Sequence, residues 1–234
     1  MSQHFVHEID RLKKRLLALG ALVEESVHRA VISVQDRDAR LATQVIKADA
    51  EIDRAEVELE EECLKVLALH QPVAQDLRFV VAVLKINSDL ERIGDLATNI
   101  ASRAFYLSSQ PPTKIPFDFF TMSEKSEWML KTTLDALVKG DTSLAYEVLA
   151  ADDEVDAINR EMYTRVESGI RQSPDELERL IHMLGVSRAL ERIADHTTNV
   201  AEDIIYMHEG QIVRHQTVQA NPPGVRAPSG GKAG

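Results

Sequence analysis

A twelve-residue stretch occurs twice in this chain, and the repeat limits the folds that the chain can adopt. Residues 90–101 return as residues 190–201 at an offset of 100, with Leu-Glu-Arg-Ile-x-Asp-x-x-Thr-Asn common to both, and Tyr106 and Tyr206 follow at matching positions. This period is longer than the roughly 20–50 residues of a solenoid unit. Because it matches the size of a small domain, we interpret the chain as a duplicated domain.

The composition is typical of a helical globular protein. The 234 residues are 44% hydrophobic and only 5% aromatic, and no apolar run approaches the roughly 20 residues of a membrane span. We expect no signal peptide, because no basic region with an apolar core begins the sequence. The net charge of −11 argues against nucleic acid as a partner and favours cations or basic protein surfaces. A single cysteine, Cys63, fits a reducing cytoplasm.

Apolar residues recur at spacings of three and four through the first half of the chain. This periodicity predicts helices over about residues 5–35, 39–69 and 72–107. Asp38 is a suitable N-cap for the second helix, and Pro72 is expected near the N1 position of the third, where its missing N–H costs little. The apolar face of the third helix comprises Phe79, Val83, Ile86, Leu90, Ile93, Ala97, Ile100 and Ala104.

The helical pattern restarts after residues 108–116, whose Ser, Gln, Thr and Pro content is typical of a linker. The predicted helices of this half cover about residues 117–139, 142–171 and 174–209. Gly140 and Asp141 indicate a C′ glycine followed by an N-cap, and residues 173–176 form a capping box with Pro at N1. The apolar residues of the fourth helix include Phe120, Trp128, Leu134, Leu137 and Val138.

The predicted fold is all-α, with two tandem, similar three-helix bundles built from six long helices. The second helix of each half also aligns, residues 38–53 with residues 141–156 at an offset of 103. The predicted units are a first bundle over 1–110, a linker over 111–116, a second bundle over 117–210 and a disordered tail over 211–234.

Acidic residues spaced four apart mark the second and third helix of each predicted bundle. Such pairs lie about 6 Å apart along a helix, on nearly the same side, and repel unless a cation or a basic partner lies between them. The four pairs are Asp49 and Asp53, Glu91 and Asp95, Asp152 and Asp156, and Glu191 and Asp195. One interpretation is that they are only solvated acidic faces.

The positions of these carboxylates favour a metal site instead. Asp49 and Asp152 interrupt the apolar stripe of their helices, where an unpaired carboxylate is costly. In antiparallel helices the two pairs of each bundle lie at similar distances from the connecting turn, so four carboxylates could meet. Carboxylates alone suit hard cations such as Mg, Mn, Fe or Ca, with Zn as a further option.

These motifs resemble the PhoU family, the phosphate-specific transport system accessory proteins. The repeated Asp-x-x-x-Asp and Glu-Arg-Ile-x-Asp carry the resemblance, together with Pro-x-x-x-Asp-Leu-Arg at residues 72–78, and it covers about residues 5–209. It implies two three-helix bundles, a homodimer and metal ions or clusters, iron or zinc in some members. By position, the ligands would be Asp49, Asp53, Glu91 and Asp95 at one site and Asp152, Asp156, Glu191 and Asp195 at the other.

The resemblance also implies a cytoplasmic, non-enzymatic role. The family restrains phosphate uptake and the phosphate regulon when phosphate is plentiful, through a phosphate-sensor histidine kinase and the ATPase subunit of the transporter. Any membrane association would be peripheral and through those partners. From the residues alone two alternatives stay open: a carboxylate-bridged metalloenzyme, either an oxidase or a phosphohydrolase, and a structural helical adaptor whose acids are only solvated.

Other chemically active residues receive structural interpretations. His196 offers a nitrogen ligand beside Asp195, but adjacent helical residues point roughly 100° apart, so we expect a surface role. Cys63 lies on an apolar face and should pack in the core. Arg92 is expected to pair with neighbouring acids rather than to hold phosphate. The Glu-x-x-His at Glu25 has no second copy, which di-iron bundles require.

Overall fold

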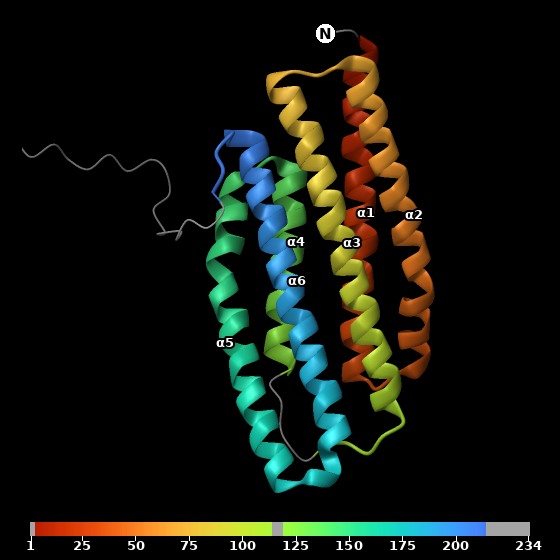
Figure 1. The fold of residues 1–234 in the computed structure, drawn as a ribbon, viewed down its shortest axis with the longest axis vertical. Helices are drawn as coiled ribbons and strands as arrows, with labels where there is room; N and C mark the ends of the chain where they lie inside the picture. The colour runs from red at the N-terminus through yellow and green to blue at the C-terminus, as the bar shows by residue number, and fades with distance from the viewer. Residues whose placement is uncertain (1–2, 114–118, 214–234) are drawn as a thin grey trace, which may run out of the picture.

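Six long helices and one 3₁₀ turn make up a computed structural model that describes residues 3–113 and 119–213. The helices are α1 (Gln3–Gln35), α2 (Ala39–His70), α3 (Ala74–Ser108), α4 (Phe119–Lys139), α5 (Thr142–Gln172) and α6 (Leu177–Glu209), with the turn η1 (Pro174–Glu176) before α6 (Figure 1). No strand occurs within those two ranges. The predicted all-α fold with two similar helical triplets is therefore confirmed.

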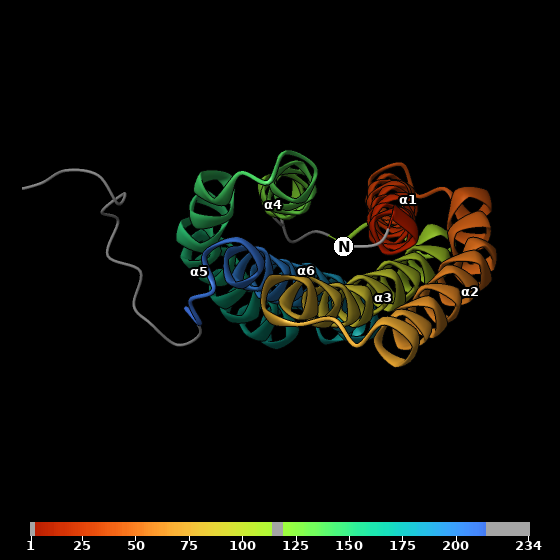
Figure 2. The same cartoon turned by 90° about the horizontal axis from the view of Figure 1, so that it is seen from above.

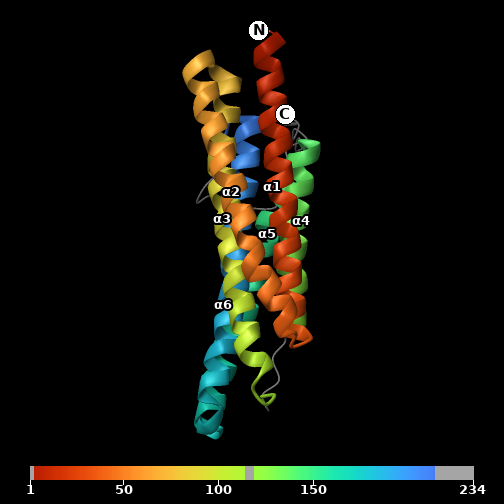
Figure 3. The same cartoon turned by 90° about the vertical axis from the view of Figure 1, so that its right-hand side faces the viewer.

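The two triplets lie side by side (Figure 1), and their helices all run along one long axis (Figure 3). Seen from above, α2, α3, α6 and α5 form a curved row, and α1 and α4 lie together on one side of it (Figure 2). Helix α1 packs on α2 and α3, and α4 packs on α5 and α6. The most extensive helix–helix contact joins α3 and α6, the two helices that carry the repeated motif. The repeat is thus paired with its own copy at the centre of the molecule.

One continuous apolar core runs through both triplets. Seven of the eight apolar residues predicted for the third helix are fully buried or nearly so, and Phe79 is half-buried against them. Leu90 and Leu190, from the two copies of the motif, both belong to this core and have no exposed surface. Each such leucine contributes about 2–3 kcal/mol by burial, so the motif leucines help fix how α3 and α6 pack.

The helix ends follow the expected capping at two of four positions. Asp38 accepts hydrogen bonds from the backbone N of Arg40 at 2.8 Å and of Leu41 at 3.0 Å. Asp141 accepts from the N of Ser143 at 3.0 Å, and these bonds satisfy N–H groups that a helix leaves free at its start. The preceding Gly140 has φ 66°, as a C′ glycine should.

One predicted helix start is wrong and a second is only partly confirmed. Helix α3 begins at Ala74 rather than near Pro72, because Gln71 ends α2 in the left-handed region and Val73 is extended, so the chain reverses before the new helix forms. Pro174 follows the N-cap Ser173 at the start of η1 as predicted, but Ser173 makes no side-chain capping bond. The Glu of the expected capping box, Glu176, instead ends η1 as a buried side chain 3.7 Å from Arg179.

Helix α4 buries only part of its apolar surface. Leu134 and Leu137 lie in the core, whereas Phe120, Trp128 and Val138 are 61%, 45% and 51% exposed. Residues 117 and 118, predicted as the start of this helix, lie outside the described residues, as does the predicted tail beyond 213. None of the helices described combines the length and the apolarity that crossing a membrane requires.

Candidate metal centre

The structure brings the four predicted carboxylates of the first half together at the α2–α3 seam. We call Asp49 and Asp53 on α2, with Glu91 and Asp95 on α3, the first carboxylate cluster. Burial raises the pKa of Asp49, and the charges of Asp53 and Asp95 add to this rise, while the nearby Thr98 offsets part of it. The pKa of Glu91 is also raised, by burial first and then by Asp95. The four acids therefore lie within electrostatic reach of one another across two helices.

Asp49 carries the most enclosed carboxylate of the first cluster. Its Oδ1 is shielded from solvent, and no donor among the described residues meets hydrogen-bond geometry there, although a weak side-chain hydrogen bond from Thr98 lowers the pKa of this carboxyl. Opposite it on α3 stands Gly94, where an added Cβ would lie 3.9 Å from that oxygen and 3.1 Å from Cγ2 of Ile52. A carboxylate oxygen without a donor in a shielded place is costly, and a bound cation would remove that cost.

The second carboxylate cluster repeats this arrangement at the α5–α6 seam, with Asp152, Asp156, Glu191 and Asp195. The pKa of Asp152 is raised to about 6, by burial first and then by the charges of Asp195, Asp156, Asp153 and Glu191. The pKa values of Glu191 and Asp195 are raised as well, chiefly by burial and then by the other carboxylates. The Oδ1 of Asp152, like that of Asp49, is shielded and has no donor in hydrogen-bond geometry among the described residues.

The two clusters differ in the groups beside them. At the first, Asn87 Nδ2 donates to the backbone O of Glu56 at 3.0 Å and to its Oε1 at 3.1 Å. The Glu56 charge contributes to the raised pKa of Glu91, so this acid extends the first cluster. At the second, Ser187 Oγ donates to Asn159 Oδ1 at 2.8 Å. Sequence reasoning missed Glu56, although its place three residues after Asp53 puts it on the same helix side.

Arginines provide part of the counter-charge. Arg92 lies 3.5 Å from both Glu91 and Asp95, and Arg160 lies 3.5 Å from Asp156. The expected pairing of Arg92 with its neighbouring acids is confirmed. These pairs are long and their arginines are exposed, so they neutralise the clusters weakly. A cation would compete with them for the same carboxylates.

His196 and Cys63 contribute to packing rather than to the clusters. His196 Nδ1 lies 2.8 Å from Asp89 Oδ1, across the α3–α6 contact, instead of turning to the second cluster. Cys63 has no exposed surface, and burial, with the charges of Glu62 and Glu60, raises the pKa of its thiol to about 12. The core role predicted for Cys63 is confirmed, whereas His196 is an interface residue rather than a surface one.

In each cluster the carboxylates lie near one another across two helices but do not converge on a single position. Across residues 3–113 and 119–213, no three Asp, Glu, His or Cys side chains converge as the ligands of one ion would. The residues nevertheless fit a hard cation in kind. Each cluster offers four carboxylates, and each has one shielded oxygen, of Asp49 or of Asp152, on a carboxyl whose pKa is raised. Side-chain rotations would be needed to bring those oxygens onto one ion.

Fold and site together define a class: a duplicated all-helical protein with an acidic cluster between the second and third helix of each copy. The family description "PhoU domain" matches residues 16–104 and again residues 119–204. The chain therefore belongs to the PhoU family. The protein is 38% identical over 212 residues to the "Phosphate-specific transport system accessory protein PhoU homolog" of Aquifex aeolicus, covering 91% of this chain and 96% of that protein.

Two solved structures share this fold. The crystal structure of PhoU from Pseudomonas aeruginosa is similar with a TM-score of 0.85 and 34% identity, covering 88% of this chain and all of that one. The phosphate transport system regulatory protein PhoU from Streptococcus pneumoniae is similar with a TM-score of 0.78 and 29% identity, covering 89% of this chain and 99% of that one. The similarity thus extends over both triplets.

Proposed function

We propose that this chain is an accessory regulator of a phosphate transport system that binds cations at its two carboxylate clusters and acts through protein contacts. The relatives named above are phosphate-specific transport accessory or regulatory proteins, and they cover about nine-tenths of this chain. Their names support the phosphate role. We extend it to negative regulation of uptake and of the phosphate regulon, exerted in the cytoplasm by a homodimer.

The partners in this proposal are the phosphate-sensor histidine kinase and the ATPase subunit of the transporter. Both would be restrained by contact with this protein when phosphate is plentiful. Membrane association would follow only from these partners. A regulator of this kind needs surfaces whose shape depends on its state, and helix seams lined by mutually repelling acids meet that need.

The observation that carries the cation part is the shielded Oδ1 of Asp49 and of Asp152, which has no donor in hydrogen-bond geometry among the described residues and belongs to a carboxyl of raised pKa. When bound, a hard cation such as Mg, Mn or Fe, or else Zn, would supply the positive charge that the clusters lack. Glu91 and Asp95 would then turn toward the Asp49 side of the seam and release Arg92. The α2–α3 and α5–α6 seams would tighten as repulsion between their carboxylates falls.

A binding comparison tests this proposal. Purified protein is either loaded with metal or freed of it by a chelator, and its affinity for the ATPase subunit and for the cytoplasmic part of the kinase is measured by calorimetry. We expect metal removal to weaken at least one interaction about tenfold, and the Asp→Asn and Glu→Gln changes at both clusters to have the same effect. Equal affinity with and without metal would exclude cation control.

A second measurement separates the regulator from an enzyme. Metal-loaded protein is incubated with a phosphate monoester and, separately, with O₂ and a reductant. We expect no turnover above a metal-free control. Hydrolysis or O₂ reduction that is lost in the cluster variants would instead favour the carboxylate-bridged metalloenzyme.

A further inference from the structure

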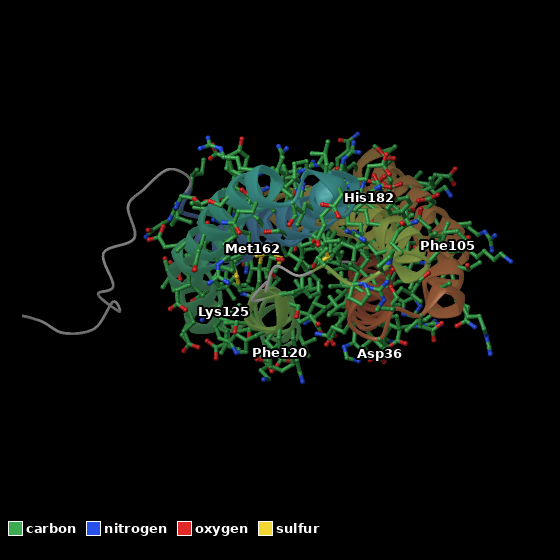
Figure 4. The ribbon with its side chains drawn as sticks, turned by 90° about the horizontal axis from the view of Figure 1, so that it is seen from below. Asp36, Phe105, Phe120, Lys125, Met162 and His182 are labelled. Carbon is green, nitrogen blue, oxygen red and sulfur yellow. The ribbon has the colours of Figure 1, made fainter. Side chains whose placement is uncertain are left out.

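An open hollow lies between α1 and α4, away from both carboxylate clusters. It has a volume of about 490 Å³, and its polar and aromatic lining consists of Glu24, Glu25 and His28 from α1 and of Glu127, Trp128 and Lys131 from α4. We call this hollow the α1–α4 groove. Its two helices occupy the same side of the molecule (Figure 2), and Figure 4 places Phe120 of α4 and Asp36, just beyond α1, on that side as well.

Trp128 is the central apolar feature of this side. A second hollow, of about 460 Å³, adjoins its other flank and is lined by Glu124, Lys125 and Glu154 among others. The tryptophan is 45% exposed, and Phe120 is 61% exposed two turns earlier on the same helix face. Large aromatic side chains that stand partly exposed between hollows are typical of protein-binding sites, where they supply most of the binding energy.

The charges around Trp128 are mostly negative. Five glutamates line the two hollows against two lysines. Glu127 is engaged by His28 at 2.8 Å, Glu25 by Arg29 at 3.8 Å, and Glu154 by Lys125. Glu24 and Glu124 make no ion pair within the described residues, so carboxylates remain on both flanks of the tryptophan for a partner's cations.

The helix packing leaves space of a definite shape here. The seam between α2 and α3 is covered by α1, and that between α5 and α6 by α4, whereas no third helix in the described chain lies on the outer side of the α1–α4 seam. A groove between two helices suits a third helix, because ridges of side chains fit the grooves of both neighbours. A second copy docked groove to groove fits poorly at this place, because five glutamates against two lysines line the hollows of each copy.

We propose that the α1–α4 groove is the docking site for a basic amphipathic helix of a partner protein. The apolar face of that helix packs on Trp128 and Phe120, and its lysines or arginines pair with Glu24 and Glu124. This inference rests on the proposed function, in which the chain acts through protein contacts, and adds the surface and the chemistry of its partner.

Trp128 is the only tryptophan of the chain and provides the readout. Protein labelled with 5-fluorotryptophan gives one ¹⁹F resonance, which is followed by NMR during titration with a helical peptide of leucine and lysine in amphipathic order. We expect this resonance to shift saturably, and the Glu24→Lys/Glu124→Lys variant to weaken binding about tenfold or more. A peptide with glutamate in place of lysine should leave the resonance unchanged.

Matched controls lie elsewhere on the surface. Glu61→Lys/Glu167→Lys makes the same change in net charge at exposed glutamates of α2 and α5, and Phe105→Ala removes an exposed aromatic side chain from α3. Both should bind within about twofold of the wild type, whereas Trp128→Ala should bind about tenfold more weakly by calorimetry. Groove variants that bind as the controls do, or a resonance that does not shift, would overturn the proposal.

The natural partners separate this inference from the proposed function. The same variants are titrated with the transporter ATPase subunit and with the cytoplasmic part of the sensor kinase. Loss of binding in the groove variants alone supports the groove. Full binding by the groove variants overturns the groove proposal and leaves the proposed regulatory function standing. If the wild type binds neither partner, the proposed function is contradicted, and the groove proposal is then judged by the peptide titration.

Two other occupants have their own signatures. If Trp128→Ala lowers the solution mass of the protein, the groove holds a second copy and the proposal is wrong. If removal of residues 214–234, a segment with basic but no acidic residues, itself shifts the Trp128 resonance, the groove holds the chain's own tail and the proposal is again wrong.

Discussion

Lys85 of α3 donates a hydrogen bond to Asp203 of α6 at 2.9 Å. The 100-residue repeat relates Lys85 to Gly185 and Asp203 to Arg103, and these two residues meet at the opposite end of the same interface. The Asp203 side chain is 2% exposed. At the other end the Arg103 guanidinium lies over Gly185, where an added Cβ would come within 2.1 Å of its Cζ. The two ends of one duplicated interface therefore depend on different chemistry: at one end an ion pair whose carboxylate is buried, at the other a contact with glycine.

Replacing Lys85 by methionine should destabilise the protein strongly. The change keeps much of the side-chain volume but leaves the carboxylate of Asp203 deep in the interface without its lysine, which costs about 2–3 kcal/mol. Urea unfolding at neutral pH measures this difference. The matched control is Lys125→Met, whose partner Glu154 is exposed, and we expect a change below about 1 kcal/mol. Equal effects of the two substitutions would contradict the assignment.

Gly94 and Ile52 form a size-matched pair at the first cluster. An alanine at Gly94 would place its Cβ 3.1 Å and 3.3 Å from two atoms of the buried Ile52, and the second repeat has Ala194 with the smaller Val155 at the corresponding positions. We expect Gly94→Ala to lose about 1 kcal/mol despite its better helix propensity, because overpacking costs more.

The double variant Ile52→Val/Gly94→Ala, which copies the second repeat, should recover this loss. A thermal-unfolding double-mutant cycle measures the coupling, which we expect to be favourable by about 1–2 kcal/mol. Additive effects would show that the two positions do not restrict each other.

The raised pKa of Asp152 makes the metal-free protein sensitive to pH. Because the pKa of this carboxyl is about 6 in the folded state, against an ordinary value of 3.8, the folded state holds a proton more tightly, and stability falls as pH rises between those values. Above about pH 6 the full penalty is present. Asp152→Asn should therefore stabilise chelated protein by about 1–2 kcal/mol near pH 7, after allowance for partial exposure, and have little effect near pH 4.

Urea unfolding across this pH range, with chelator present throughout, gives the comparison. Glu147→Gln, at an exposed position on the same helix and outside the groups that raise the Asp152 pKa, is the control and should change stability by less than about 0.5 kcal/mol. A destabilising Asp152→Asn at neutral pH would mean that the ionised carboxylate has a stabilising partner in the metal-free protein.

Cys63 should be unreactive in the native state. Its thiol has no exposed surface, and its pKa is raised to about 12 by burial and by Glu62 and Glu60, so almost no thiolate exists at neutral pH. A thiol-reactive disulfide reagent should label the cysteine only at the rate of unfolding, and fully in about 6 M guanidinium chloride. Rapid labelling of folded protein would contradict the core position.

The sequence predicted the helices well because their signals are local. The apolar periodicity located α1, α2, α5 and α6 to within about two or three residues. The failures at Pro72 and Ser173 concern single turns, where the path of the chain between two helices decides which residue starts the next one. That path depends on packing across the bundle, which a sequence window does not contain.

The candidate site was predictable only in part for the same reason. Spacing placed the four carboxylates of each half on adjacent helices, and the structure puts them within electrostatic reach across the seam without closing them around one point in the described residues. The α3–α6 contact was not foreseen, so the partner of His196, Asp89 more than 100 residues away, was missed. Exposure of Trp128 was missed too, because an apolar residue in a helical pattern gives no sign of which face will remain uncovered.

Metal content per chain is the most direct test of the central claim, that both carboxylate clusters bind cations. Protein is purified without chelator, loaded with candidate metals, freed of excess by gel filtration and assayed by elemental analysis. The wild type is compared with variants carrying Asn or Gln at the four acids of the first cluster, of the second cluster, or of both.

The account predicts that each four-residue variant loses the metal of its own cluster. The eight-residue variant should hold none while keeping its helical circular dichroism. An eight-residue variant that retains the wild-type metal content would contradict it.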